Sequence, residues 1–140
     1  MRCSTSGWRG STPAERPRDR LGRPLPQDGS AGSDAAFPQV PERDLVTSAQ
    51  AIDEASPYLG DELPFHAHEV LEQRWRCAPE DEVALWKALA QAAAGRTHLA
   101  RGNPTGASRL HDRARQGLQA YDGPRPDGLD ELLTALGLGD

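Results

Sequence analysis

Residues 80–121 read EDEVALWKALAQAAAGRTHLARGNPTGASRLHDRARQGLQAY, and this stretch decides the fold. Apolar residues recur on both sides of its centre at steps of three and four, the period of an amphipathic α-helix. At the centre, Gly102 suits the left-handed position that ends a helix, Asn103 suits the cap of the next helix, and Pro104 suits its first position. So short a connection predicts two antiparallel neighbouring helices, one ending near Arg101 and one beginning at Pro104.

Further helices are predicted on either side of this pair. Apolar residues at 45, 46, 49, 52 and 55 predict an amphipathic helix that begins near Pro41 and ends before Pro57. Another opens around residues 61–64 and ends near Cys77, because Pro79 disfavours helix at the residue before it. A short segment over 129–138 can add a last helix, and there is no strand pattern. The sequence therefore predicts an all-α protein, a small antiparallel bundle of four to five helices.

The first forty residues differ in composition from the rest. They are rich in Pro, Gly, Ser and Arg and have almost no apolar periodicity. Such a segment buries too little surface to offset the entropy of ordering it. We expect a disordered tail over 1–40 and a single helical domain over 41–140, with its core at about 45–121. The sequence leaves open the role of the tail and whether it belongs to the native protein.

Charge and hydropathy exclude several classes of function. The net charge is −5, and the first forty residues hold six arginines against four acids, so the helical part carries −7. A broad nucleic-acid surface needs clustered Lys and Arg, so nucleic acid is an unexpected partner. No apolar run approaches the ~20 residues of a membrane span, and there is no secretory h-region. We expect a cytoplasmic protein whose partner is a small molecule or another protein, with homo-oligomers left open.

The helix predicted to end near Cys77 carries the chemistry. At about 100° per residue, Phe65, Leu71 and Trp75 define one face, and His68 and Glu72 stand in the middle of it. His66 is expected to point away. His68 and Glu72 lie one turn apart and can touch or grip one ion between them. A carboxylate that faces a core needs a hydrogen-bonded partner, a counter-charge or a metal.

Further members of the site are expected from the helix that ends near Arg101. His98 falls on a polar stripe roughly 120° round from the Trp86 face, and it is the expected third member. The remaining candidates border the site on either helix, and these are Glu69, Trp75, Lys87 and Gln91. A Lys87 ammonium close by would disfavour a metal and could pair with Glu72.

Three interpretations of the site stay open at this stage. His68, Glu72 and His98 could bind a divalent metal such as Zn, Fe, Mn or Ni, with Glu69 as an outer ligand or proton acceptor. His68 and Glu72 could instead form a buried pair that only fixes helix packing in a non-catalytic structural or interaction bundle. They could also act as a metal-free acid–base pair. Whether the protein is an enzyme is undecided; metal-assisted hydrolysis is the expected reaction if it is one.

Two blocks of sequence carry a family resemblance. In the first, His68, three residues, Glu72, two residues and Trp75 follow one another. The second runs from Leu85-Trp86 through Ala90-Gln91 and His98 to Arg101-Gly102-Asn103 and Gly106-Ala107. Together they cover about half the chain and resemble the bacterial and archaeal family called domain of unknown function 309, although Lys87-Ala88 stands where Gln-Gly is common. The resemblance implies an all-helical fold with no characterised activity and a suggested metal site, here His68 and Glu72.

Overall fold

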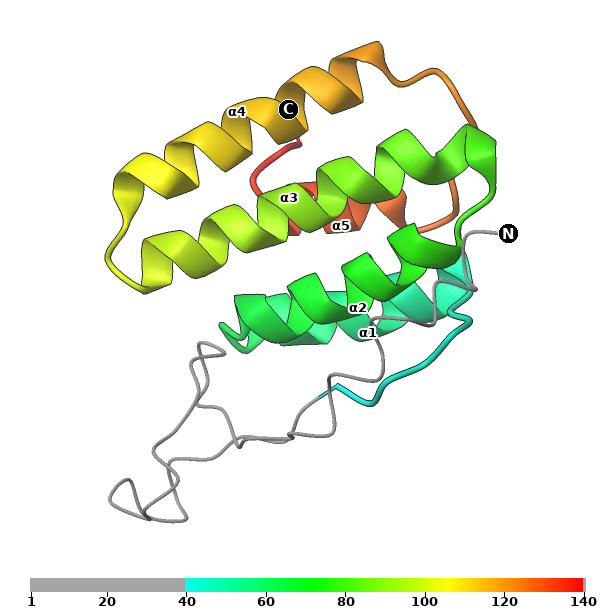
Figure 1. Cartoon of the computed structure of the whole chain (residues 1–140), viewed down its shortest axis with the longest axis horizontal. Coiled ribbons are helices and arrows are strands. Elements are labelled where there is room, and N and C mark those ends of the chain that lie inside the picture. Colours follow the sequence, from blue (N-terminus) through cyan, green and yellow to red (C-terminus); the bar gives the residue numbers. More distant parts are fainter. Residues whose placement is uncertain (1–39, 140) are drawn as a thin grey trace.

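The computed structural model describes residues 40–139, and all of its regular structure is helical. In Figure 1, α3 lies centrally, with α4 along one side and α2 and α1 on the other, while α5 lies behind. The elements are α1 (Ser48–Gly60), α2 (Pro64–Cys77), the 3-10 turn η4 (Glu80–Glu82), α3 (Val83–Ala100), α4 (Pro104–Ala120) and α5 (Leu129–Ala135). The predicted all-α bundle is confirmed. The predicted tail, apart from Val40, lies outside the described residues.

The connection between α3 and α4 is built as the sequence predicts. Gly102 has a φ of 85°, in the left-handed region where a side chain would be strained. Its amide donates to the carbonyl of Leu99 at 3.0 Å, and the amide of Asn103 donates to that of His98 at 2.8 Å, the two bonds of a Schellman ending. The Asn103 side chain then accepts from the Gly106 amide at 3.0 Å and caps α4. The chain thus reverses within three residues, and α4 returns along α3.

Helix α3 packs against α2 on one side and against α4 on the other. Large side chains face the rest of the bundle, and Trp86 and Leu89 are both 0% exposed. The opposite side is made of small residues. A Cβ at Gly95 would stand 3.2 Å from the Ala107 carbonyl oxygen, and one at Gly117 would stand 3.4 Å from the Cβ of Ala88. Glycine at position 95 therefore lets α3 and α4 approach closely, whereas a Cβ at position 117 would make an ordinary contact.

Helix α1 begins and ends later than predicted. Thr47 accepts from the Gln50 amide while the Gln50 side chain accepts from the Thr47 amide, and this capping box starts the helix at Ser48. Leu45, expected on the buried face, is 72% exposed. Pro57 lies inside the helix, in its last two turns, and does not end it. The apolar spacing alone could not place this start, because the cap fixes it.

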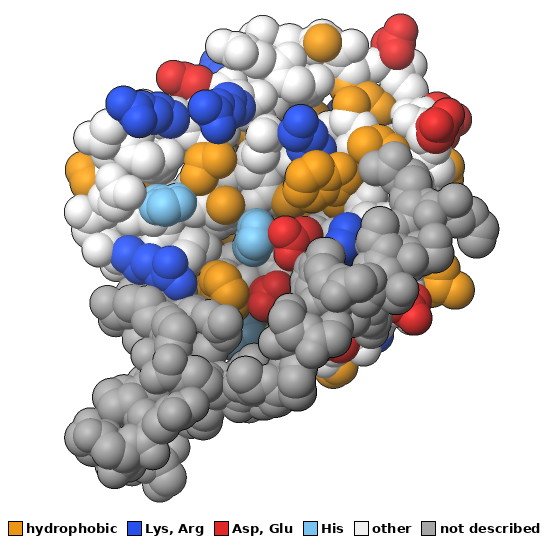
Figure 2. Space-filling view, in the orientation of Figure 1, with side chains coloured by type: hydrophobic (Ala, Val, Ile, Leu, Met, Phe, Trp, Pro, Cys, Tyr) orange, Lys and Arg blue, Asp and Glu red, His pale blue; other side chains and the backbone are white. Residues whose placement is uncertain are grey.

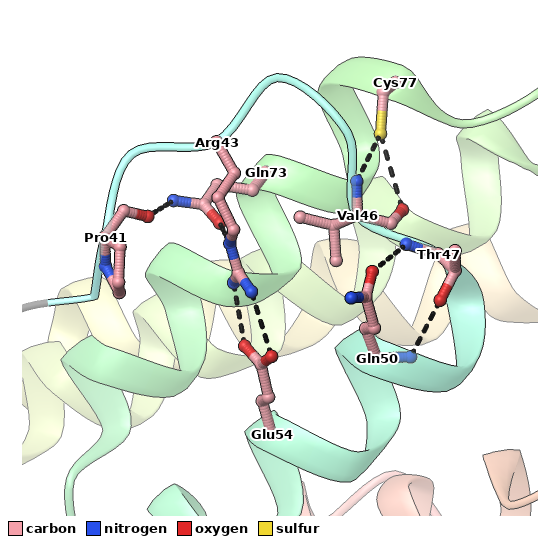
Figure 3. A network of polar contacts seen from close by, with 8 residues as sticks. All are labelled: Pro41, Arg43, Val46, Thr47, Gln50, Glu54, Gln73 and Cys77. Carbon is pink, nitrogen blue, oxygen red and sulfur yellow. Dashed lines mark hydrogen bonds and ion pairs between the residues drawn. The ribbon is translucent and has the colours of Figure 1, made fainter.

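Residues 41–47 form an extended strap across α1 and α2 (Figure 3). Arg43 makes a two-pronged ion pair with Glu54 of α1, at 2.7 and 2.9 Å, and its Nε donates to Gln73 of α2 at 3.0 Å. The Gln73 amide donates in turn to the carbonyl of Pro41 at 2.7 Å. Because these bonds join the strap to two helices, the strap is part of the domain.

A partly buried ion pair fixes the end of α2 against α3. The Arg74 guanidinium donates to the Val46 carbonyl at 3.0 Å and to Glu82 at 3.1 Å. The same Glu82 oxygen accepts from the Trp86 indole at 2.9 Å, and the guanidinium lies 5.4 Å from the Trp86 ring centre. The Glu82 carboxylate therefore links α2, η4 and α3, and Arg74 extends the connection to the strap. Among the described residues, no helix has the length and apolar character of a membrane span.

We predict that Glu82→Ala lowers the free energy of unfolding by roughly 2–4 kcal/mol, because Arg74 loses its counter-charge and the Trp86 indole loses its acceptor. The side chains of Arg74 and Glu82 are 11% and 17% exposed. The matched control is Asp130→Ala, which breaks the Arg125 pair, whose side chains are 54% and 84% exposed. It should cost less than about 1 kcal/mol. Urea denaturation measures both, and equal costs would contradict the assigned role of Glu82.

Candidate functional site

The sequence predicted a buried face of α2 with His68 and Glu72 at its centre, and this prediction is wrong. The residues of α2 that face the core are Ala67, Val70 and Leu71, each 0% exposed. His66, predicted to point away, is 4% exposed, and its ring centre lies 5.3 Å from that of Tyr58 in α1. The reason is that α2 packs on both α1 and α3, so its buried arc is wide and extends to the His66 side. The spacing of the large apolar residues indicated packing against a single neighbouring helix.

His68 and Glu72 consequently lie at the border of the core. Both are partly buried, as are Glu69 and Trp75. Figure 2 shows histidine and acidic side chains next to one another over α2 and α3, with hydrophobic side chains around them. Among residues 40–139 the structure gives no hydrogen bond between His68 and Glu72, although the charge of Glu72 acts on the His68 ring. The pair therefore reaches the surface of the bundle.

His68 has a neutral ring over a wider pH range than an ordinary histidine. Burial lowers its pKa, and the charges of Arg76 and Arg101 lower it further, while the Glu72 carboxylate opposes them. The His68 ring also lies against Phe65, with 6.0 Å between ring centres. These groups give His68 an available lone pair near neutral pH.

Phe65 connects His68 to the far end of α3. The Arg101 guanidinium lies 5.7 Å from the centre of the Phe65 ring, the contact of a cation with an aromatic face. Arg101 is the residue that ends α3, so the turn into α4 brings its charge to the α2 site. The site is thus assembled from α2 and the α3–α4 turn.

His98, the expected third member, is held by the α3–α4 turn. Its Nδ1 lies 3.1 Å from Nδ2 of Asn103, and Oδ1 of Asn103 accepts from the Gly106 amide. His98 is partly buried, and a proton on its ring would lower the pKa of His68. The structure therefore brings His98 into the electrostatic environment of His68.

The other predicted members from α3 differ in how far they are exposed. Gln91 is partly buried, but Lys87 is exposed. The cations that act on His68 are Arg76 and Arg101, which the sequence interpretation did not select. The sequence could have identified Arg76, because it follows His68 by about two helical turns. It could not have identified Arg101, because the distance from Arg101 to His68 depends on how α3 packs.

The predicted three-ligand metal centre is not assembled in this arrangement. Within residues 40–139 no group of three or more His, Cys, Asp and Glu side chains stands close enough together to hold a metal ion. The Nδ1 atom of His98 faces a donor, the Asn103 amide. His68 and Glu72 offer two donor groups, and a metal on them stays a prediction.

The lowered pKa of His68 predicts a pH-dependent stability. Below 6.5, the ordinary value, the unfolded chain takes up a proton that folded His68 resists, so protonation favours unfolding. The free energy of unfolding should therefore rise with pH between the folded-state pKa of His68 and 6.5, and stay level above it as far as His68 is concerned.

Urea denaturation over a pH series tests this. His68→Asn should flatten the rise, because it removes the titrating ring. Glu72→Gln should steepen it, because the carboxylate that raises the His68 pKa is gone. If the pH profiles of the two variants and the parent chain were parallel, the pKa of His68 would be the same in the folded and the unfolded chain, which would contradict this prediction.

Comparison with known proteins gives one family. Residues 52–110 match the model of a family described as "Domain of unknown function (DUF309)". Neither the curated proteins nor the solved structures gave a match. The matched residues run from α1 through the turn that holds Asn103 into α4, and they include His68, Glu72 and His98.

Proposed function

We propose that the surface around His68 and Glu72 is a proton-transfer site, at which neutral His68 takes a proton from a small ligand. The observation that carries the proposal is the placement of the pair. Both side chains are only partly buried, so each is in part accessible to solvent, and among residues 40–139 the His68 ring makes no hydrogen bond to another helix. A histidine is the side chain best suited to exchange protons near neutral pH.

The role of Glu72 is to stabilise the proton that His68 accepts. Its carboxylate favours the protonated form of His68, whereas burial and the charges of Arg76 and Arg101 favour the neutral form. The ring therefore begins neutral and gains a stabilising neighbour once it holds a proton, as in a carboxylate–histidine pair of an acid–base site. Since the two residues lie one turn apart on α2, the helix itself fixes their separation.

The packing alternative predicts a different result from mutagenesis. If the pair only held helices together, removing either member would destabilise the bundle. The proposal predicts that His68→Gln and Glu72→Gln each change the free energy of unfolding at neutral pH by less than about 1 kcal/mol. Leu71→Ala, on the same helix and 0% exposed, should cost roughly 2–5 kcal/mol. Comparable losses from all three would favour the packing alternative.

The proton affinity of His68 can be measured directly. In an NMR titration of isotopically labelled protein, the pKa of His68 should lie below 6.5. It should fall further in Glu72→Gln and rise in Arg101→Gln, because each variant removes one charge that acts on the ring. A pKa that neither variant moves would contradict the electrostatic coupling and, with it, the proposed site.

Elemental analysis of protein purified without chelator separates proton transfer from metal binding. The proposal expects no stoichiometric transition metal. A stoichiometric metal that His68→Ala removes, while the circular dichroism of the fold is kept, would replace the proton-transfer site with a metal site. The arrangement of His98 and the Arg76 and Arg101 charges support the metal-free alternative.

A further inference from the structure

Asn103 serves two helices with one side chain. Its Oδ1 accepts from the Gly106 amide at 3.0 Å, which caps α4, while its Nδ2 lies 3.1 Å from Nδ1 of His98 in the last turn of α3. The Gly106 amide is a donor only, so the atom that faces it must be the oxygen of the Asn103 amide. The cap therefore fixes which end of the amide meets His98.

This orientation determines where His98 carries its hydrogen. The Asn103 NH₂ group is a donor only, so Nδ1 of His98 has to accept. In a neutral imidazole whose Nδ1 accepts, the hydrogen is on Nε2, and Nε2 is then a donor. The capping bond of α4 thereby sets the tautomer of a histidine on α3.

Gly106 makes room for this contact. A Cβ at position 106 would stand 2.6 Å from Nδ2 of Asn103 and 3.3 Å from Nδ1 of His98. The first separation is shorter than any real Cβ contact, so a side chain there would displace the Asn103 amide. Glycine at this position is needed for the contact, even though its backbone lies in an ordinary helix.

We propose that Asn103 is a positioning residue that holds His98 as a neutral hydrogen-bond donor, through Nε2–H, for the ligand of the His68 site. This inference rests on the proposed function. His68 accepts a proton and His98 offers a hydrogen bond, so the two rings act in opposite senses. The ligand they fit is a small molecule with an acidic proton and an oxygen acceptor, a carbonyl or a carboxylate. His98 in this tautomer cannot bind a metal through Nε2, because that nitrogen holds the hydrogen.

The decisive variant is Asn103→Asp. Aspartate caps a helix as well as asparagine does, so Asn103→Asp should fold with the midpoint of thermal unfolding of the parent chain. The carboxylate can no longer donate to His98 and should instead accept from it. The ¹⁵N spectrum of the full-length protein, at alkaline pH where imidazole is neutral, should show His98 with its hydrogen on Nε2 in the parent chain and on Nδ1 in Asn103→Asp.

Gly106→Ala gives a second, independent test. It should abolish the fixed tautomer of His98 by moving the Asn103 amide, whereas Gly117→Ala, the same change on the same helix, should leave it intact. The added Cβ at 117 would meet only the Cβ of Ala88, at 3.4 Å. A His98 hydrogen on Nδ1 in the parent chain, or an unchanged tautomer in Asn103→Asp, would overturn the inference.

Acetate is the probe for the acceptor half of the ligand. It should shift the ¹⁵N resonance of His98 Nε2 in the parent chain, where Nε2 holds the hydrogen, and this shift should be at least halved in Asn103→Asp. An equal shift in the parent chain and in Asn103→Asp would show that acetate accepts no hydrogen bond from Nε2 of His98. The titration of His68 is read on the same samples. An ordinary His68 pKa beside a fixed His98 tautomer would remove the proton-transfer site and leave the role of Asn103 standing.

Discussion

The close approach of α3 and α4 is the constraint on which the other contacts depend. Helix α3 buries large side chains toward α2 and presents small residues to α4 on its opposite side. Gly95 and Ala88 let α4 lie against that side with backbone nearly touching backbone. Dispersion contacts at this range are individually weak, yet they are summed over the length of two helices. The arrangement leaves α2 free to present a polar border to solvent.

The candidate site is a product of this geometry. Helix α2 contributes His68 and Glu72, but the groups that tune them come from the end of α3 and the turn that follows. A turn that reverses the chain within three residues brings Arg101, His98 and Asn103 to one place. The same turn both closes the fold and supplies the charges, so the electrostatics of the site follow from how α3 ends.

Much of the fold could be predicted, because its determinants are local. The Gly-Asn-Pro signal placed the α3–α4 turn correctly, and Pro79 placed the end of α2. The start of α1 was missed because the Thr47 capping box decided it against the apolar spacing. The site was predicted only in part. His68 and Glu72 are readable from a helical wheel, but the burial of His66 depends on a second neighbouring helix. The ion pair of Arg74 with Glu82 depends on η4, which no sequence period indicates.

The strap over residues 41–47 has a mechanical consequence. It is fastened by Arg43 to Glu54 and by Gln73 to Pro41, bonds that lie between the strap and the flanks of α1 and α2. Tension applied to the chain ahead of Pro41 would load these polar clamps in shear before it reached Ala55 or Leu71 in the core. The polar bonds of the strap therefore bear such a force first, ahead of the buried contacts between the helices.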